Sequence, residues 1–174
     1  WAIPFVPWLA MSVRPAPVFA PLTARALVLA VLAMGAVVLL SNVLVQYPIN
    51  DWLTWGAFSY PVAFLVSNLI NRRFGPGPAR RVAWAGFALA VVLSFWVATP
   101  RIAVASCSAF IVAQLLDITV FDRLRRGSWW RAPMVATTCS ATVDTAIFWS
   151  IAFAGSALPW MSWALGDLAV KLAI

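Results

Sequence analysis

Six apolar runs, separated by short polar loops, restrict what this chain can form more than any other feature of its sequence. A helix that crosses a bilayer needs about 20 mostly apolar residues, and irregular backbone cannot be solvated in lipid. The runs therefore predict an all-α, polytopic transmembrane helix bundle with a kink at Pro61. We expect spans at about residues 24–44, 52–70, 82–98, 101–121, 133–154 and 160–174; the last holds only about 15 residues and is incomplete in this chain.

Charge is too scarce for a soluble surface, because 64% of the residues are hydrophobic and only 10% are charged. On a soluble protein the net charge of +7 would suggest a nucleic-acid partner, but no nucleic-acid-reading motif is present. The arginines instead cluster in the loops after the second and fourth runs and before the first run. These loops lie on one side of the membrane, and the positive-inside rule then predicts that both termini are cytoplasmic. The residues concerned are Arg72, Arg73, Arg80 and Arg81, then Arg123, Arg125, Arg126 and Arg131, and finally Arg14 and Arg25.

The first 22 residues contain five prolines, which argue against a regular helix there. We interpret residues 1–22 as a Pro-rich N-terminal leader or interfacial tail, and residues 23–174 as the six-helix transmembrane domain. A homo-oligomer in the bilayer is compatible with this pattern.

Several kinds of chemistry are excluded by missing residues. The chain has two cysteines and no histidine, too few ligands for a tetrahedral zinc site, and we expect Cys107 and Cys139 to be free thiols. No nucleotide-binding motif of the form G-x-x-x-x-G-K-[ST] is present, so the chain does not hydrolyse ATP itself. We expect no cofactor and no metal.

Two aspartates inside the spans are the strongest candidates for a binding site. An ionised carboxylate near the bilayer centre costs at least about 2.5–3.5 kcal/mol, so such a group faces a partner or a wet cavity. At about 100° per residue, Asp117 shares a helix face with Ser106 and Gln114, and Asp144 shares one with Thr137 and Ser140.

Other polar residues in the spans allow both a structural and a functional interpretation. Asp167 and Lys171 have the i, i+4 spacing of an ion pair, and Asn42 and Gln46 have the spacing of a hydrogen-bonded pair. Arg101 follows Pro100 and either meets one of the buried acids or extends outward. Serines and threonines in such spans more often serve packing than binding.

Acceptors that converge from different helices suit a ligand rich in N–H donors, such as a 2-amino pyrimidinone edge, which a carboxylate binds with paired hydrogen bonds. Aromatic rings could enclose a flat heterocycle, although each ring could equally be packing in the core or facing lipid. The rings concerned are Phe58, Tyr60, Phe110, Phe148 and Trp149.

Four motifs stand out in order between about residue 40 and residue 174: WGAFSYP, QLLDITVF, the VDT triplet and the D-x-x-x-K of the last run. Together they resemble the queuosine precursor transporter family, also called the vitamin uptake transporter family. The resemblance implies bacterial inner-membrane uptake of the 7-deazaguanine bases preQ0 and preQ1, salvaged for the tRNA nucleoside queuosine.

The resemblance also implies a set of ligand or gating residues. Where the family usually has an aspartate in the motif T-D-L, this chain has Ser67, Asn68 and Leu69, and the neutral amide of Asn68 can still hydrogen-bond a base. The candidate substrate-binding residues are Asn42, Gln46, Asn68, Arg101, Gln114, Asp117, Asp144, Asp167 and Lys171.

Three other interpretations compete with a stand-alone transporter. A substrate-binding membrane subunit of an energy-coupling-factor-type vitamin importer would also have six helices and a vitamin-like ligand. An intramembrane enzyme would need a nucleophile with its base, or a metal set, and neither is visible. A purely structural membrane protein leaves Asp117 and Asp144 unexplained.

Overall fold

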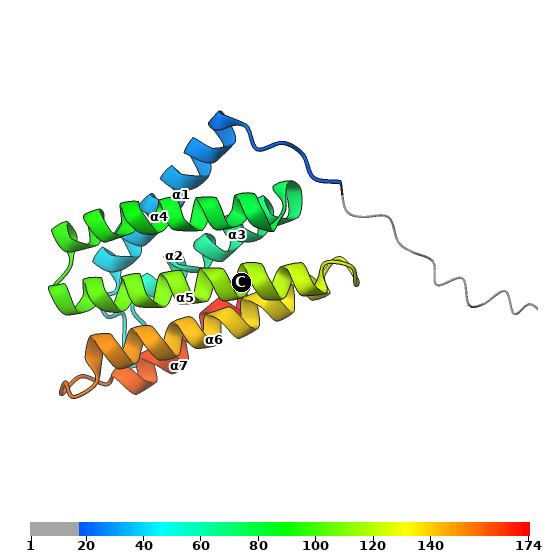
Figure 1. Ribbon diagram of the computed structural model, residues 1–174. Coiled ribbons are helices and arrows are strands. Elements are labelled where there is room, and N and C mark those ends of the chain that lie inside the picture. Colours follow the sequence, from blue (N-terminus) through cyan, green and yellow to red (C-terminus); the bar gives the residue numbers. More distant parts are fainter. Residues whose placement is uncertain (1–17) are drawn as a thin grey trace, which may run out of the picture.

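The computed structural model describes residues 18–174, and over that range it consists of helices joined by short loops (Figure 1). The first 17 residues of the predicted N-terminal tail lie outside the described residues, and residues 18–23 precede the first helix. The predicted all-α bundle is confirmed. The helices are α1 (Ala24–Leu44), α2 (Gly56–Ser59), α3 (Pro61–Phe74), α4 (Pro76–Val97), α5 (Pro100–Leu124), α6 (Arg131–Phe153) and α7 (Trp160–Ala173).

The second predicted span is the one whose form differs most from the expectation. Its first residues form a loop closed by an isolated bridge between Pro48 and Thr54, and the remainder is divided into α2 and α3 at Tyr60. Tyr60 keeps right-handed helical backbone angles, so the chain continues in nearly the same direction. The division arises because Pro61 lacks the N–H that would continue the hydrogen-bond ladder.

Three of the described helices, α1, α4 and α5, are long and apolar enough to cross a membrane by length and composition. Helix α6, with 23 residues, is not among these three. Helices α3 and α7 have 14 residues each, about 21 Å of helix at 1.5 Å per residue.

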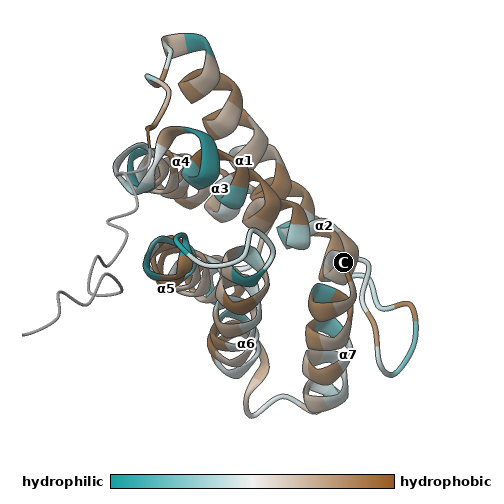
Figure 2. Ribbon diagram, turned by 90° about the vertical axis from the view of Figure 1, so that its right-hand side faces the viewer, coloured by the Kyte–Doolittle hydropathy of each residue, from teal (hydrophilic) through white to brown (hydrophobic). Residues whose placement is uncertain are grey.

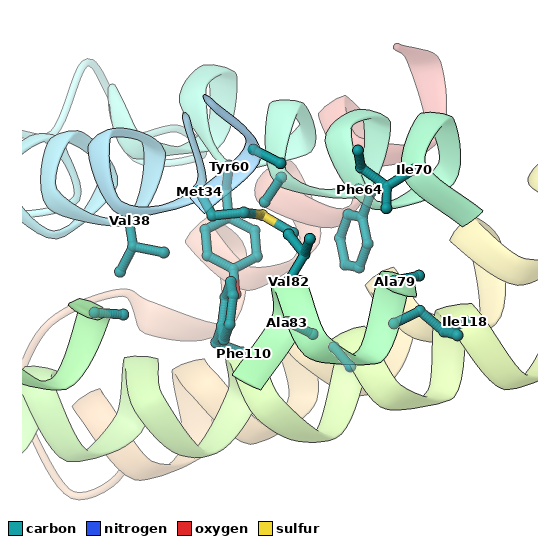
Figure 3. Packing of buried hydrophobic residues seen from close by; sticks show 14 of the residues in the cluster. Met34, Val38, Tyr60, Phe64, Ile70, Ala79, Val82, Ala83, Phe110 and Ile118 are labelled. Atoms are coloured by element: carbon teal, nitrogen blue, oxygen red, sulfur yellow. The ribbon is translucent and has the colours of Figure 1, made fainter. Parts of the chain in front are cut away.

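The helices pack around α5, which lies between α4 on one side and α6 on the other (Figure 1). Helix α1 crosses α4 obliquely and also contacts α3, whereas α7 packs against α6 and α2. The main apolar cluster lies between α1, α3, α4 and α5, where Met34, Tyr60, Phe64, Val82 and Phe110 meet (Figure 3).

The outer surface of the bundle is apolar, as a lipid-facing surface should be. Figure 2 shows apolar ribbon along most of the length of the helices, with hydrophilic segments concentrated near their ends. Large side chains such as Leu32, Phe95, Trp96 and Leu165 are more than half exposed. A soluble protein rarely exposes so much contiguous apolar surface, so the surrounding medium is lipid.

The arginine-rich loops lie together at one end of the bundle, as the sequence predicted. Arg72 in the last turn of α3 donates a hydrogen bond of 2.6 Å to the carbonyl oxygen of Trp129 before α6, and Arg125 donates to the side-chain oxygen of Asn71. The backbone N–H of Ala20 donates to the carbonyl oxygen of Arg73, which brings the segment before α1 to the same end. We call this the arginine end.

Small residues let several segments approach closely where lipid offers no hydrophobic driving force between helices. The backbone of Gly166 in α7 lies directly against the carbonyl oxygen of Trp52, and a methyl group added at Gly166 would overlap that oxygen. Gly86 in α4 lies against Met34 of α1, where an added methyl group would come within 3.1 Å.

We therefore expect Gly166→Ala to destabilise the bundle, because the loop between α1 and α2 must move away from α7. Overpacking costs typically about 1–3 kcal/mol, which should lower the midpoint of thermal unfolding in detergent by several degrees. Gly77→Ala is the matched control, because nothing lies within 4 Å of the added methyl group. Equal midpoints for the two variants would contradict the close contact at Gly166.

Candidate functional site

The only lysine of the chain is buried between two aspartates. Lys171 of α7 is 4% exposed, and its Nζ lies 2.7 Å from Oδ2 of Asp144 in α6 and 2.6 Å from Oδ2 of Asp167, one turn earlier in α7. Asp144 is 2% exposed and Asp167 is 5% exposed. Three charges are thus held together inside the bundle, and their sum is one negative charge.

Hydrogen bonds hold this cluster in a fixed arrangement on the side of Asp167. Oδ2 of Asp167 accepts from the hydroxyl of Thr145 at 3.0 Å and from the indole N–H of Trp149 at 3.3 Å. Lys171 also donates to Thr145 at 3.2 Å, and its ammonium lies 4.8 Å from the centre of the Tyr60 ring. Asp167 is therefore well compensated by its protein partners, as a structural ion pair should be.

Asp144 is less completely satisfied than Asp167. Its second oxygen, Oδ1, lacks a hydrogen bond of normal geometry within residues 18–174, and the buried hydroxyl of Tyr60 lies close enough to interact with the same carboxylate. Unpaired buried polar atoms are rare in folded proteins and call for a reason. A cavity of about 30 Å³ adjoins both groups, enough for one or two water molecules.

Five helices line this cavity, which we call the central cavity. Asn42 lines it from α1, and the amide of Asn42 is fixed by a hydrogen bond of 2.5 Å to Ser94 in α4. The rings of Tyr60 and Phe148 form part of its wall, so two of the five predicted aromatic residues are present there. The complete lining is Ser41, Asn42, Val45, Gly56, Tyr60, Ser106, Asp144, Phe148, Asp167 and Lys171.

A larger cavity of about 430 Å³ lies between α3, α6 and the end of α7. Asn68 and Thr137 line it, together with mostly apolar residues from the first half of α3 and the first two turns of α6. Lys171 lines both cavities. The Lys171–Asp144 pair thus stands between the central cavity and this larger one, which we call the arginine-side cavity.

A second polar cluster lies one to two turns from Asp144 along α6. Oδ1 of Asp117 accepts from Ser140 at 3.1 Å, and Asn68 donates to Thr137 at 3.0 Å. Asp117 and Gln114 are both 0% exposed and line neither cavity. In the described part of the chain, Oδ2 of Asp117 and both amide atoms of Gln114 have no hydrogen-bond partner.

Two predicted site residues lie at the other end of the bundle and outside both cavities. Gln46 is exposed and donates to the carbonyl oxygens of Asn42 and Val97. Arg101 meets neither buried acid, because its guanidinium donates to the carbonyl oxygens of Ile151 at 2.7 Å and Ala154 at 2.5 Å. It therefore caps the C-terminal end of α6, where carbonyl groups lack helical partners.

The other predicted aromatic residues have different environments. Trp149 is buried and its indole N–H donates to Asp167. Phe110 belongs to the apolar core, and Phe58 is about half exposed. Three hydroxyl residues that sequence reasoning did not select, Ser41, Ser94 and Thr145, contribute to the polar network. Their only signal in the sequence was a small hydroxyl within an apolar run, which is common in membrane helices.

Comparison with known proteins gives a consistent family. The family described as "Putative vitamin uptake transporter" matches residues 54–99 and 94–174. The chain is 37% identical to the "Queuosine precursor transporter" of Escherichia coli K12, covering 77% of this chain and 74% of that protein. It is 35% identical to a "Probable queuosine precursor transporter" of Haemophilus influenzae, covering 63% and 55% of the two chains. A protein of the same name from Bacillus subtilis is 27% identical, covering 70% and 66%. No solved structure matches the chain.

The charge cluster predicts a specific pattern of stability. Lys171→Met leaves two buried carboxylates without a cation, and removing one partner of a buried ion pair costs about 3–5 kcal/mol. We expect this variant to lose most of its folded, detergent-extractable protein. Replacing both acids as well, in Asp144→Asn/Asp167→Asn/Lys171→Met, should restore much of it, as judged by gel filtration in detergent. A triple variant no more stable than Lys171→Met would show that charge compensation is not what the lysine supplies.

Proposed function

We propose that this chain, which belongs to the putative vitamin uptake transporter family, imports the queuosine precursors preQ0 and preQ1 across a bacterial inner membrane. The family makes the chain a transporter of a small molecule rather than an enzyme. The names of the relatives support a queuosine precursor as the cargo. The more specific assignment to two 7-deazaguanine bases is the part that we argue from chemistry.

The observation that carries the proposal is the free carboxylate oxygen of Asp144 beside the central cavity. A 7-deazaguanine base presents two adjacent donors, the ring N1–H and the exocyclic 2-amino group. A carboxylate accepts such a pair with parallel hydrogen bonds, which are stronger than bonds between neutral groups. Tyr60 and Phe148, in the cavity wall, provide surfaces on which a flat base can stack.

The central cavity must widen to accept a base, because its present volume suits only water. In our proposal the base enters from the end opposite the arginine end. There it takes the place of Lys171 as a hydrogen-bond donor to Asp144. Rearrangement of the Lys171–Asp144 pair then connects the central cavity to the arginine-side cavity. This is a form of alternating access, in which a site near mid-membrane opens to one side at a time.

The proposed direction follows from the distribution of arginines. The arginine end is assigned to the cytoplasm by the positive-inside rule, which places the N-terminal segment there. A multi-pass chain with both termini cytoplasmic is the orientation that we propose.

The 2-amino group provides a test that leaves the protein unchanged. Uptake of labelled preQ1 should be inhibited by 7-deazaguanine much better than by 7-deazahypoxanthine, which lacks only the 2-amino donor. A lost hydrogen bond to a charged group is worth about 1.5–3 kcal/mol, so the inhibitory concentrations should differ by about 10- to 150-fold. Equal inhibition by the two compounds would show that Asp144 does not accept a hydrogen bond from the 2-amino group of the base.

The variant Asp144→Asn should reduce uptake of labelled preQ0 and preQ1 in cells that lack another route, while the protein still reaches the membrane. Asp51→Asn is the matched control, because Asp51 is exposed in the loop between α1 and α2. Tyr60→Phe removes only a hydroxyl group and should weaken uptake less. Normal uptake by Asp144→Asn would exclude the proposed site.

The same assay on purified protein distinguishes the alternative of an energy-coupling-factor-type subunit. The chain alone in liposomes should move labelled preQ0 across the bilayer. Binding without transport, with transport restored only by a coupling subunit and ATPases, would favour the alternative.

A further inference from the structure

Asp117 is an acid buried in the membrane domain that the proposed substrate site does not use. It is fully buried, it lines neither cavity, and its Oδ2 has no hydrogen-bond partner in the described range. An ionised carboxylate in such a place costs several kcal/mol unless a positive charge accompanies it. Its known partners, Ser140 and Thr137, are neutral hydroxyl groups.

The charged groups on the surrounding helices are either paired with other residues or exposed at the arginine end. In α7 and α6, Lys171 is paired with Asp144 and Asp167, and in α5 Asp122 is paired with Arg125. Arg72 of α3 donates to Trp129 and lies over the Phe121 ring. The arginines of α1 and α4 are exposed at the arginine end, and none of the ion pairs found in residues 18–174 includes Asp117. These exposed arginines are Arg25, Arg80 and Arg81.

We propose that Asp117 takes up and releases a proton during transport, and that this proton couples uptake of the base to a proton gradient. The inference rests on the proposed function, because it assigns the energy source of the same transporter. A proton fits this position better than a metal cation for a simple reason of space. Neither cavity reaches Asp117, whereas a proton needs no volume beyond a carboxylate oxygen.

A path for the proton runs through α6. Thr137 lines the arginine-side cavity and interacts with the Asp117 carboxylate, while Asn68 donates a hydrogen bond to its hydroxyl oxygen. The hydroxyl group of Thr137 can pass its proton to the Asp117 carboxylate and accept another from solvent in the cavity. The net change is one new O–H bond on Asp117 and one proton fewer in the solvent. Release reverses these steps.

Coupling also needs a connection between the proton and the cargo. Ser140, which donates to Asp117, lies one turn from Asp144 on α6, about 6 Å along the helix axis. Ser140 also bonds to the carbonyl oxygen of Ala136 on its own helix at 2.7 Å. Charge on Asp117 thus acts on the same helix that carries the proposed base-binding carboxylate.

The test uses the purified full chain in liposomes with labelled preQ0, whose nitrile group leaves the base neutral. With the interior one pH unit more alkaline, the unsubstituted protein should accumulate preQ0 by up to about tenfold, because one pH unit corresponds to about 1.4 kcal/mol per proton. A protonophore should abolish this accumulation, and replacing sodium ions should not change it. Transport that ignores the pH difference, or that requires sodium ions, would overturn the inference.

Asp117→Asn mimics the protonated acid and is the decisive variant. It should lose gradient-driven accumulation while keeping the preQ0 affinity and the exchange of labelled for unlabelled preQ0. The control Asp51→Asn should behave like the unsubstituted protein. Full accumulation by Asp117→Asn would overturn the inference, and so would loss of preQ0 binding, because Asp117 would then belong to the base site. If the unsubstituted protein neither binds nor exchanges preQ0, the proposed function fails instead.

Discussion

The compensation of buried charge determines how the second half of this bundle is arranged. The chain has five acidic residues, and three of them lie inside the bundle with its only lysine. Charges at lipid depth are costly unless they are paired and hydrogen-bonded. Lys171 therefore fixes α7 against α6 through two carboxylates at once, and the two helices cannot separate without exposing charge to lipid. The central cavity lies beside this pair, so any rearrangement that admits a ligand must give Asp144 and Lys171 new hydrogen-bonding or charged partners.

Packing by small residues makes this electrostatic arrangement possible. Apolar side chains gain little by leaving lipid for another apolar surface, so close contact has to be supplied by shape. Gly166 lets the loop after α1 lie directly on α7, and Gly56 brings the start of α2 against the backbone of Val45. These two contacts hold α1, α2 and α7 around the central cavity. Two of the segments that line the site, α2 with four residues and α7 with 14, are too short to be stable alone.

The sequence predicted those features that depend on local pattern. Apolar runs gave the helices, the arginine clusters gave a common end, and the i, i+4 spacing of Asp167 and Lys171 gave their ion pair. The pairing of Lys171 with Asp144 spans 27 positions and depends on how α6 packs against α7, so spacing could not reveal it. Gln46 and Arg101 were assigned to the site by the family resemblance, but each donates to backbone carbonyl oxygens near a helix end. A polar side chain within one turn of a helix end therefore has a local use that a residue at mid-span lacks.

The contrast between the two deeply buried acids of α5 and α6 follows from what each one faces. Asp144 has a neighbouring cation and an adjoining cavity, so its unpaired oxygen can accept hydrogen bonds from a neutral ligand at modest cost. Within residues 18–174, Asp117 belongs to none of the ion pairs and lines neither cavity, so its own protonation is the simplest change of its charge. A transporter can link two such events only if each alters the affinity for the other. Because Ser140 and Asp144 lie one turn apart on α6, a small displacement of that helix is enough to provide this link.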